Sequence, residues 1–203
     1  MKRLLGVLSA LLLLASCAVV DKAGLAASVN DNQLSVDQLA GYIEQMNQAV
    51  GEQGLGIDPG EMNRGVINAF IVEYILNEMA ASYGVSATDA EVTARIRALE
   101  LEFGSRSELL RGAAESLIAE DRLFESIRAG LNTAKLGEYF APDQNQEEQN
   151  DLLFIELIEY AKTFDIQVAP RFGTWDSEFM VLMESTSDVV LTEEFFDFIQ
   201  NGS

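Results

Sequence analysis

Apolar residues recur every three or four positions through most of the chain, which predicts a body built from amphipathic helices. The first stripe follows the capping pattern Ser35–Gln38, and the second runs from about Gly60 to Tyr83. Between them, residues 51–60 hold four glycines and one proline, which predicts a loop. The second helix is expected to end at Gly84, because glycine tolerates the left-handed backbone of a C-terminal cap.

Capping patterns also mark the helices that follow. Thr88–Glu91 is a capping box that opens a third helix reaching Phe103, and Ser105–Glu108 opens a fourth whose apolar stripe continues to Leu131. Beyond these the pattern predicts, in order, a short helix over Thr133–Phe140, a polar linker over Ala141–Asn150 and a long helix over Asp151–Phe164.

Two short segments near the ends of this helical region read as strands. Leu25–Val29 is one, and Phe164–Val168, which Pro170 ends, is the other. A strand without a partner is not stable in water, so the two are expected to pair and to lie against the helices. The expected fold class is therefore mostly α, with a small two-stranded β element formed by segments near the two ends.

The first sixteen residues follow a different pattern. Lys2 and Arg3 precede an apolar run from Leu4 to Ala15, which is shorter than the roughly 20 residues needed to cross a bilayer. A positive start, a short apolar run and small residues before Cys17 predict an export signal over residues 1–16. An ordinary cleaved signal followed by an incidental cysteine is the alternative.

The segment LASC at Leu14–Cys17 resembles the lipobox of bacterial lipoproteins. The resemblance implies cleavage between Ser16 and Cys17 and attachment of acyl chains such as palmitate at Cys17. Cys17 is the only cysteine of the chain, so it has no disulfide partner within it. Two or more acyl chains hold a protein stably to a membrane. Residues 17–24 would then be a lipid-anchored tether on the extracytoplasmic face of the cell membrane or outer membrane.

Charge and composition narrow the classes of partner and reaction. The chain has 33 acidic and 13 basic residues, and loss of Lys2 and Arg3 would bring its net charge from −20 to −22. Such a charge repels nucleic acid, so no nucleic-acid partner is expected. The chain has no histidine, the commonest general base and transition-metal ligand. No catalytic residue, metal site or cofactor is predicted, although a carboxylate metal site and a pair of serine with Lys22, Lys135 or Lys162 remain open alternatives.

Two segments resemble the SurA/PrsA family of extracytoplasmic chaperones, namely YGVSATDAEV at residues 83–92 and IQVAPRFGTWD at residues 166–176. The resemblance covers residues 25–176 and implies the helical SurA N-terminal-like domain, whose fold is of the trigger factor/SurA peptide-binding type. It also implies that the opening strand pairs with the late strand, and that the domain binds unfolded or exported polypeptides. Residues 177–203 would follow as an acidic C-terminal tail.

The chain departs from many members of that family, which carry a parvulin prolyl-isomerase domain between the late helices. Here only the polar linker at 141–150 stands in that place, and the histidines of parvulin chemistry are missing. A chaperone-like lipoprotein that holds polypeptides without catalysis is therefore the first hypothesis. The alternatives are an accessory lipoprotein that docks one envelope partner and, third, a residual prolyl isomerase.

Pliable apolar and aromatic side chains are the candidate contacts for polypeptides. The alternative for each is a place in the core of the domain, or in a structural corner for the last two. The candidates are Met46, Met62, Phe70, Met79, Phe172 and Trp175.

Overall fold

The structure is a computed structural model that describes residues 24–51 and 54–184. The expected signal, with Ser16 and Cys17, and most of the expected acidic tail lie outside the described residues. In chain order the elements are β1 (Leu25–Val29), β2 (Asn32–Ser35), α1 (Val36–Val50), α2 (Pro59–Ser82), α3 (Asp89–Glu102), α4 (Arg106–Glu115), the 3-10 turn η2 (Glu120–Arg122), α5 (Leu123–Phe140), α6 (Gln146–Ala161), β3 (Ile166–Val168), β4 (Thr174–Asp176) and β5 (Val181–Met183).

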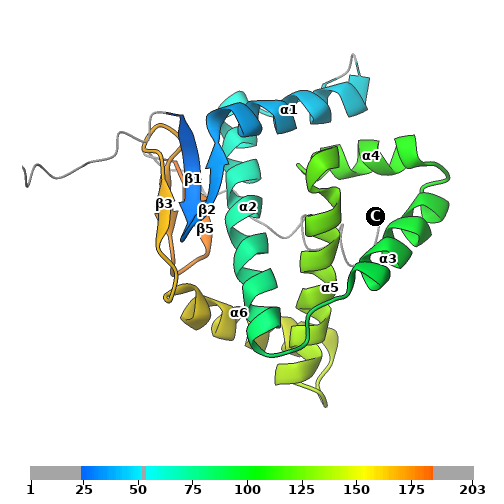
Figure 1. The fold of residues 1–203 in the computed structure, drawn as a ribbon, viewed down its shortest axis with the longest axis vertical. Helices are drawn as coiled ribbons and strands as arrows, with labels where there is room; N and C mark the ends of the chain where they lie inside the picture. Colours follow the sequence, from blue (N-terminus) through cyan, green and yellow to red (C-terminus); the bar gives the residue numbers. More distant parts are fainter. Residues whose placement is uncertain (1–23, 52–53, 185–203) are drawn as a thin grey trace, which may run out of the picture.

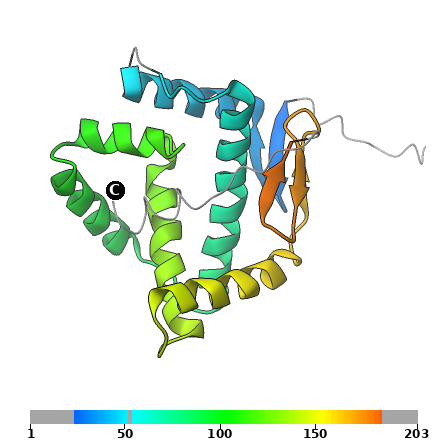
Figure 2. The same cartoon turned by 180° about the vertical axis from the view of Figure 1, so that it is seen from behind.

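Helix α2 runs through the middle of the molecule, with the strands on one side and α5 on the other (Figure 1). Helix α1 lies across one end of α2, and α6 crosses the other end of α2 and α5 (Figure 2). Helix α3 packs against α5, and α4 packs against α1 and α3, on the side of α5 away from the strands (Figure 1). The chain is mostly α, as its apolar periodicity predicts.

The two end segments pair as the sequence predicts. Strands β1 and β3 are antiparallel, with Ala27 opposite Val168 and Val29 opposite Ile166. The chain also turns back at Asn30, which has a positive φ of 52°, and adds β2 to the other side of β1. Asparagine tolerates this left-handed conformation better than most residues. The expected two-stranded element is thus corrected to a three-stranded sheet of order β2-β1-β3.

A second small sheet spans the expected end of the domain, with β4 before it and β5 after it. Strands β4 and β5 form an antiparallel pair in which Trp175 lies opposite Leu182. Met180, Val181 and Leu182 are buried. The compact fold therefore continues beyond the boundary expected at Asp176, through the last described residue, Glu184.

The predicted helix starts at Ser35 and Thr88 are confirmed. Each hydroxyl accepts a hydrogen bond from the backbone N–H three residues on, and Gln38 and Glu91 accept in return from the cap N–H groups. Helix α2 begins after Asp58, whose carboxylate accepts from two backbone N–H groups. Local hydrogen bonds of this kind depend only on neighbouring residues, so the sequence pattern reveals them.

One predicted helix is broken into two. The stripe from Ser105 to Leu131 predicts a single helix, whereas a turn and η2 separate α4 from α5. Leu117 in this turn has a positive φ of 61°, and the N–H of Ile118 donates to the carbonyl of Ala113 at 2.8 Å. The short helix expected over Thr133–Phe140 is the second half of α5.

The second half of the expected linker at 141–150 is helical. Helix α6 begins at Gln146, five residues before the predicted start at Asp151. Asn145 caps it by accepting from the N–H of Glu148, and the Glu148 carboxylate accepts from the N–H of Asn145. The polar composition of residues 141–150 is typical of a surface linker, so the capping box formed by Asn145 and Glu148 was not predicted from the sequence.

Buried apolar side chains form two clusters. The larger surrounds α2, where Ile67, Ile71 and Ile75 are fully buried between the strands and the neighbouring helices. The smaller joins α3, α4 and α5 and includes Val92 and Leu109. Helices α1 and α4 pack against each other where the two clusters meet, and that junction positions the candidate site.

Candidate functional site

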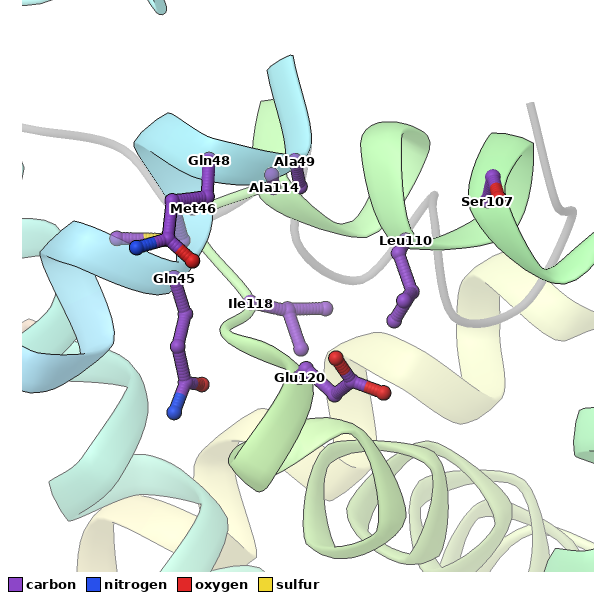
Figure 3. Close-up of a pocket in the computed structure, with 9 residues that line it drawn as sticks. All are labelled: Gln45, Met46, Gln48, Ala49, Ser107, Leu110, Ala114, Ile118 and Glu120. Carbon is purple, nitrogen blue, oxygen red and sulfur yellow. The ribbon is translucent and has the colours of Figure 1, made fainter. Parts of the chain in front are cut away.

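A groove of about 310 Å³ lies between α1 and α4 (Figure 3). Figure 3 shows Leu110, Ile118 and Glu120 pointing toward the same space from α4, the following turn and η2. Apolar walls with a few polar groups are the usual composition of a binding pocket. The apolar lining residues are Met46, Ala49, Leu110, Ala114 and Ile118, and the polar ones are Gln45, Gln48, Ser107 and Glu120.

The floor of the groove joins the two cores. Met46 belongs to the larger cluster and Ile118 to the smaller, and both are almost fully buried. Leu110 is only half-buried, so part of its side chain stays open to solvent. The groove therefore offers two partly exposed apolar side chains, Leu110 and Ala49, above a closed apolar floor.

Gln45 ties α1 to η2 at the edge of the groove. Its Nε2 donates to Oδ2 of Asp121 at 2.6 Å, and its Oε1 accepts from the N–H of Asp121 at 3.1 Å. The two bonds use both ends of the amide, so they set the distance between these elements. The width of the groove at this end is thereby defined by side-chain hydrogen bonds.

Glu120 places an acidic side chain at the opening of the groove, and its charge is paired. Arg106 donates to Glu100 at 2.9 Å and to Glu120 at 3.1 Å. The carboxylates of Glu100 and Glu120 raise the pKa of Arg106, Glu100 having the larger effect. These exposed pairs add little stability. Their effect here is to orient Glu120 at the opening.

The structure places four of the predicted contact residues in the core. Met46, Met62, Phe70 and Met79 are 0–6% exposed. Met46 also lines the groove, and Phe70 lines a second pocket beside β2. Met62 and Met79 belong to the core of the domain, which was the alternative to polypeptide binding in the sequence analysis. They are buried because strands and helices surround α2 on most sides.

Phe172 and Trp175 lie at the turn into β4. Both are half-buried and pack against the larger cluster. The guanidinium of Arg171 lies over the ring of Phe172, 4.9 Å from its centre. The indole Nε1 of Trp175 is buried and has no hydrogen-bond partner within residues 24–51 and 54–184. In this arrangement the two rings pack the last strands against the helices. This structural role was the alternative to polypeptide binding in the sequence analysis.

One buried carboxylate in α2 was not predicted from the sequence. Glu73 is 1% exposed, forms an ion pair with Arg122 and accepts from the hydroxyl of Ser126. Burial raises the pKa of Glu73, while the charge of Arg122 and the hydrogen bonds from Ser126 and Arg122 oppose that rise. Arg122 and Ser126 lie about fifty residues further along the chain, so no local pattern connects them with Glu73.

Two of the lysines considered for a serine–lysine pair form ion pairs, Lys135 with Glu91 and Lys162 with Glu159. Lys22 lies outside the described residues. Within residues 24–51 and 54–184, no group of three or more potential metal ligands is arranged around one point. No helix in the same ranges combines the length and the apolar character needed to cross a membrane.

The model of the SurA-like N-terminal domain family matches residues 4–108, slightly more than half of the chain. The chain belongs to this SurA-like family. SurA-like N-terminal domains are chaperone-type, non-catalytic domains that occur outside the cytoplasm and bind unfolded polypeptides in general. Neither a curated protein nor a solved structure matches the chain.

The SurA-like match covers one wall of the groove and, on the other wall, only Ser107 of the lining residues. It includes α1, with Gln45 and Met46, and ends just inside α4. Leu110 and Ile118 of the other wall follow the match. Helical periodicity marks Leu110 as apolar, but only the packing of α4 on α1 makes it part of a groove.

Proposed function

We propose that the groove between α1 and α4 binds segments of unfolded or exported polypeptides, and that the protein is a chaperone-like lipoprotein without catalytic activity. The observation that carries the proposal is the apolar lining of this groove in a SurA-like domain. Apolar client side chains would contact Leu110, while the hydroxyl of Ser107 and the amide of Gln48 would bond to the client backbone. Such contacts select no particular sequence, which suits broad binding.

Exposed apolar side chains elsewhere support the same function. On α6, Ile155 is 58% exposed, and Leu152 and Phe154 are each 44% exposed. Surface apolar residues of this size add weak contacts for an unfolded chain. The net charge of −20 favours solubility of a protein that handles apolar partners.

The decisive experiment is suppression of aggregation by the full chain held in lipid nanodiscs. Chemically denatured citrate synthase and reduced insulin serve as unrelated clients. Wild type should suppress both at near-stoichiometric ratio. Leu110→Gln should bind a client about tenfold more weakly, because it removes most of one apolar contact in the groove.

Leu101→Gln is the matched control, since it makes the same change at an exposed site that does not line the groove. Its suppression should equal that of wild type, with thermal unfolding measured for both variants to establish folding. If the two variants suppress aggregation equally, the groove is not the site that binds clients. A wild type that suppresses neither client but retains one partner would favour the accessory-module alternative. Accelerated isomerisation of a proline peptide would overturn the non-catalytic proposal.

The proposal also places the protein on the extracytoplasmic face of the cell membrane or outer membrane, held by lipid on Cys17. Cys17→Ser should lose incorporation of labelled palmitate and leave the membrane fraction, because no thiol remains to accept the lipid. Ser16→Ala keeps a small residue before the cysteine and should retain both label and membrane association. If Cys17→Ser still sediments with membranes, the lipid is not the anchor.

A further inference from the structure

Strand β2 forms an edge of the three-stranded sheet. The order β2-β1-β3 leaves one side of β2 without a neighbouring strand in the described chain. An edge strand presents unpaired backbone N–H and C=O groups, to which an extended segment of another chain can bond. Natural proteins commonly protect such edges, so an open one is informative.

The ladder identifies which β2 residue presents these groups. On β1, the carbonyl of Ala26 accepts from Ala169 and the N–H of Asn30 donates to Asp165, so these alternate residues face β3 and its flanks. Ala27 between them therefore faces β2, where it lies opposite Leu34. Backbone groups alternate along an antiparallel strand. Gln33, the neighbour of Leu34, thus directs its N–H and C=O away from β1.

A pocket of about 290 Å³ opens directly beside this edge. Asn32, Gln33 and Leu34 form one side of it, and α1, α2 and the start of α5 form the rest. Its far walls include the rings of Tyr42 and Tyr74. Aromatic faces attract a cation that lies over them.

The surroundings of the pocket carry more negative than positive charge. Glu73 and Glu125 line it, and among the described residues of its lining only Arg122, which pairs with Glu73, is basic. The pKa of Tyr74 is raised by burial first, and then by the negative charges of Glu78 and Asp31. Glu125 is half-exposed and shares Arg128 with Asp89. The pocket therefore suits a positively charged side chain.

We propose that the free edge of β2 is a second polypeptide-binding site, which pairs with an extended client segment and takes one lysine or arginine side chain of that segment into the adjoining pocket. Backbone bonds at Gln33 would supply affinity that does not depend on sequence. The acidic, aromatic pocket would favour segments with a basic residue. This inference rests on the proposed binding of polypeptides but assigns it to a surface separate from the α1–α4 groove.

The probe is a fluorescent seven-residue peptide of alternating threonine and valine with a central lysine. Binding to the full chain in nanodiscs is followed by fluorescence polarisation. A peptide with norleucine at the centre should bind about fivefold more weakly, and one with glutamate more weakly still. N-methylation of the backbone beside the central residue should weaken binding about tenfold, since it removes strand pairing.

Two pairs of variants locate the site. Gln33→Pro removes the outward N–H of β2 and should weaken binding of the lysine peptide about tenfold. Gln33→Thr keeps this N–H and should bind the peptide more tightly than Gln33→Pro does. Glu125→Gln should reduce the preference for lysine over norleucine, and Glu138→Gln, on the same helix but outside this pocket, should not. Should Gln33→Pro fail to fold by circular dichroism, the N-methylated peptide still tests strand pairing on the wild type.

The outcomes separate this inference from the proposed groove. Equal binding of lysine, norleucine and N-methylated peptides, or no loss with Gln33→Pro, overturns the β2 site even if aggregation is suppressed. Lysine-selective binding that Leu110→Gln leaves unchanged supports the β2 site alone. Absence of both peptide binding and aggregation suppression removes both proposals.

Discussion

Glu73 illustrates how single residues connect distant parts of this protein. It lies on the apolar stripe of α2, where an unpaired carboxylate would be costly to bury. Arg122 and Ser126 contact its two oxygens, and the guanidinium of Arg122 lies 5.4 Å from the centre of the Phe70 ring. The network therefore joins the middle of α2 to η2 and the start of α5.

Replacement of Glu73 by glutamine tests how much the buried negative charge lowers the free energy of unfolding. Because burial raises the pKa of Glu73 in the folded protein, the unfolded chain releases this proton at lower pH than the folded one. Stability contributed by the protonated form is thus lost as pH rises from the usual glutamate pKa through the raised value. We expect wild type to lose unfolding free energy relative to Glu73→Gln as pH increases, measured by urea denaturation from about pH 4 to about pH 8. A pH-independent difference would contradict the assignment.

At the scale of elements, the β4–β5 hairpin depends on a few polar contacts with α2. Oδ1 of Asn68 accepts from the buried N–H of Leu182 at 2.8 Å, and Arg64 pairs with Glu184 at 3.2 Å. At Gly173, where φ is +135°, an added Cβ would lie 2.2 Å from the carbonyl oxygen of Met183. A side chain at this position would therefore push the hairpin apart.

Asn68→Ala should destabilise the protein by about 1–3 kcal/mol, because the N–H of Leu182 would remain buried without an acceptor. Urea denaturation measures the loss. Asn47→Ala, at an exposed position of α1, should change the unfolding free energy by less than about 0.5 kcal/mol. A loss at Asn68 no larger than at Asn47 would show that the hairpin does not need this bond.

For the whole molecule, the family match and the folded unit do not coincide. The match ends at residue 108, yet β3, β5, α5 and α6 cover α2 and the first strand. Leu136, Leu153, Leu157 and Leu182 are all nearly fully buried. Residues beyond the match thus complete the core of the SurA-like segment.

A chain that ends at residue 108 should lack a cooperative unfolding transition, because the apolar faces of α2 would lose their cover. A chain that ends at Glu184 keeps every described element and should unfold cooperatively. Circular dichroism during urea titration distinguishes the two. A cooperative transition of the shorter chain at the same midpoint would show that the later elements are dispensable.

Features that arise from neighbouring residues were predictable from the amino-acid sequence. The caps at Ser35 and Thr88 were predictable because donor and acceptor lie within three positions of each other. The end of α2 was predictable because Gly84 has the positive φ, 72°, that its place after the helix requires. The mostly helical class followed from apolar periodicity, and the pairing of β1 with β3 from the presence of two lone strand patterns and the family resemblance.

Which surfaces of the helices meet depends on the packing of the folded chain. Three features join residues or helix faces that share no local sequence pattern. They are the break at Leu117, the contact of Gln45 with Asp121 and the pairing of Glu73 with its partners. Apolar periodicity predicts that a side chain such as Leu110 faces other apolar groups, but it does not predict which groups these are. A groove exists only where two such faces meet incompletely, so the candidate sites depend on packing between segments far apart in the chain.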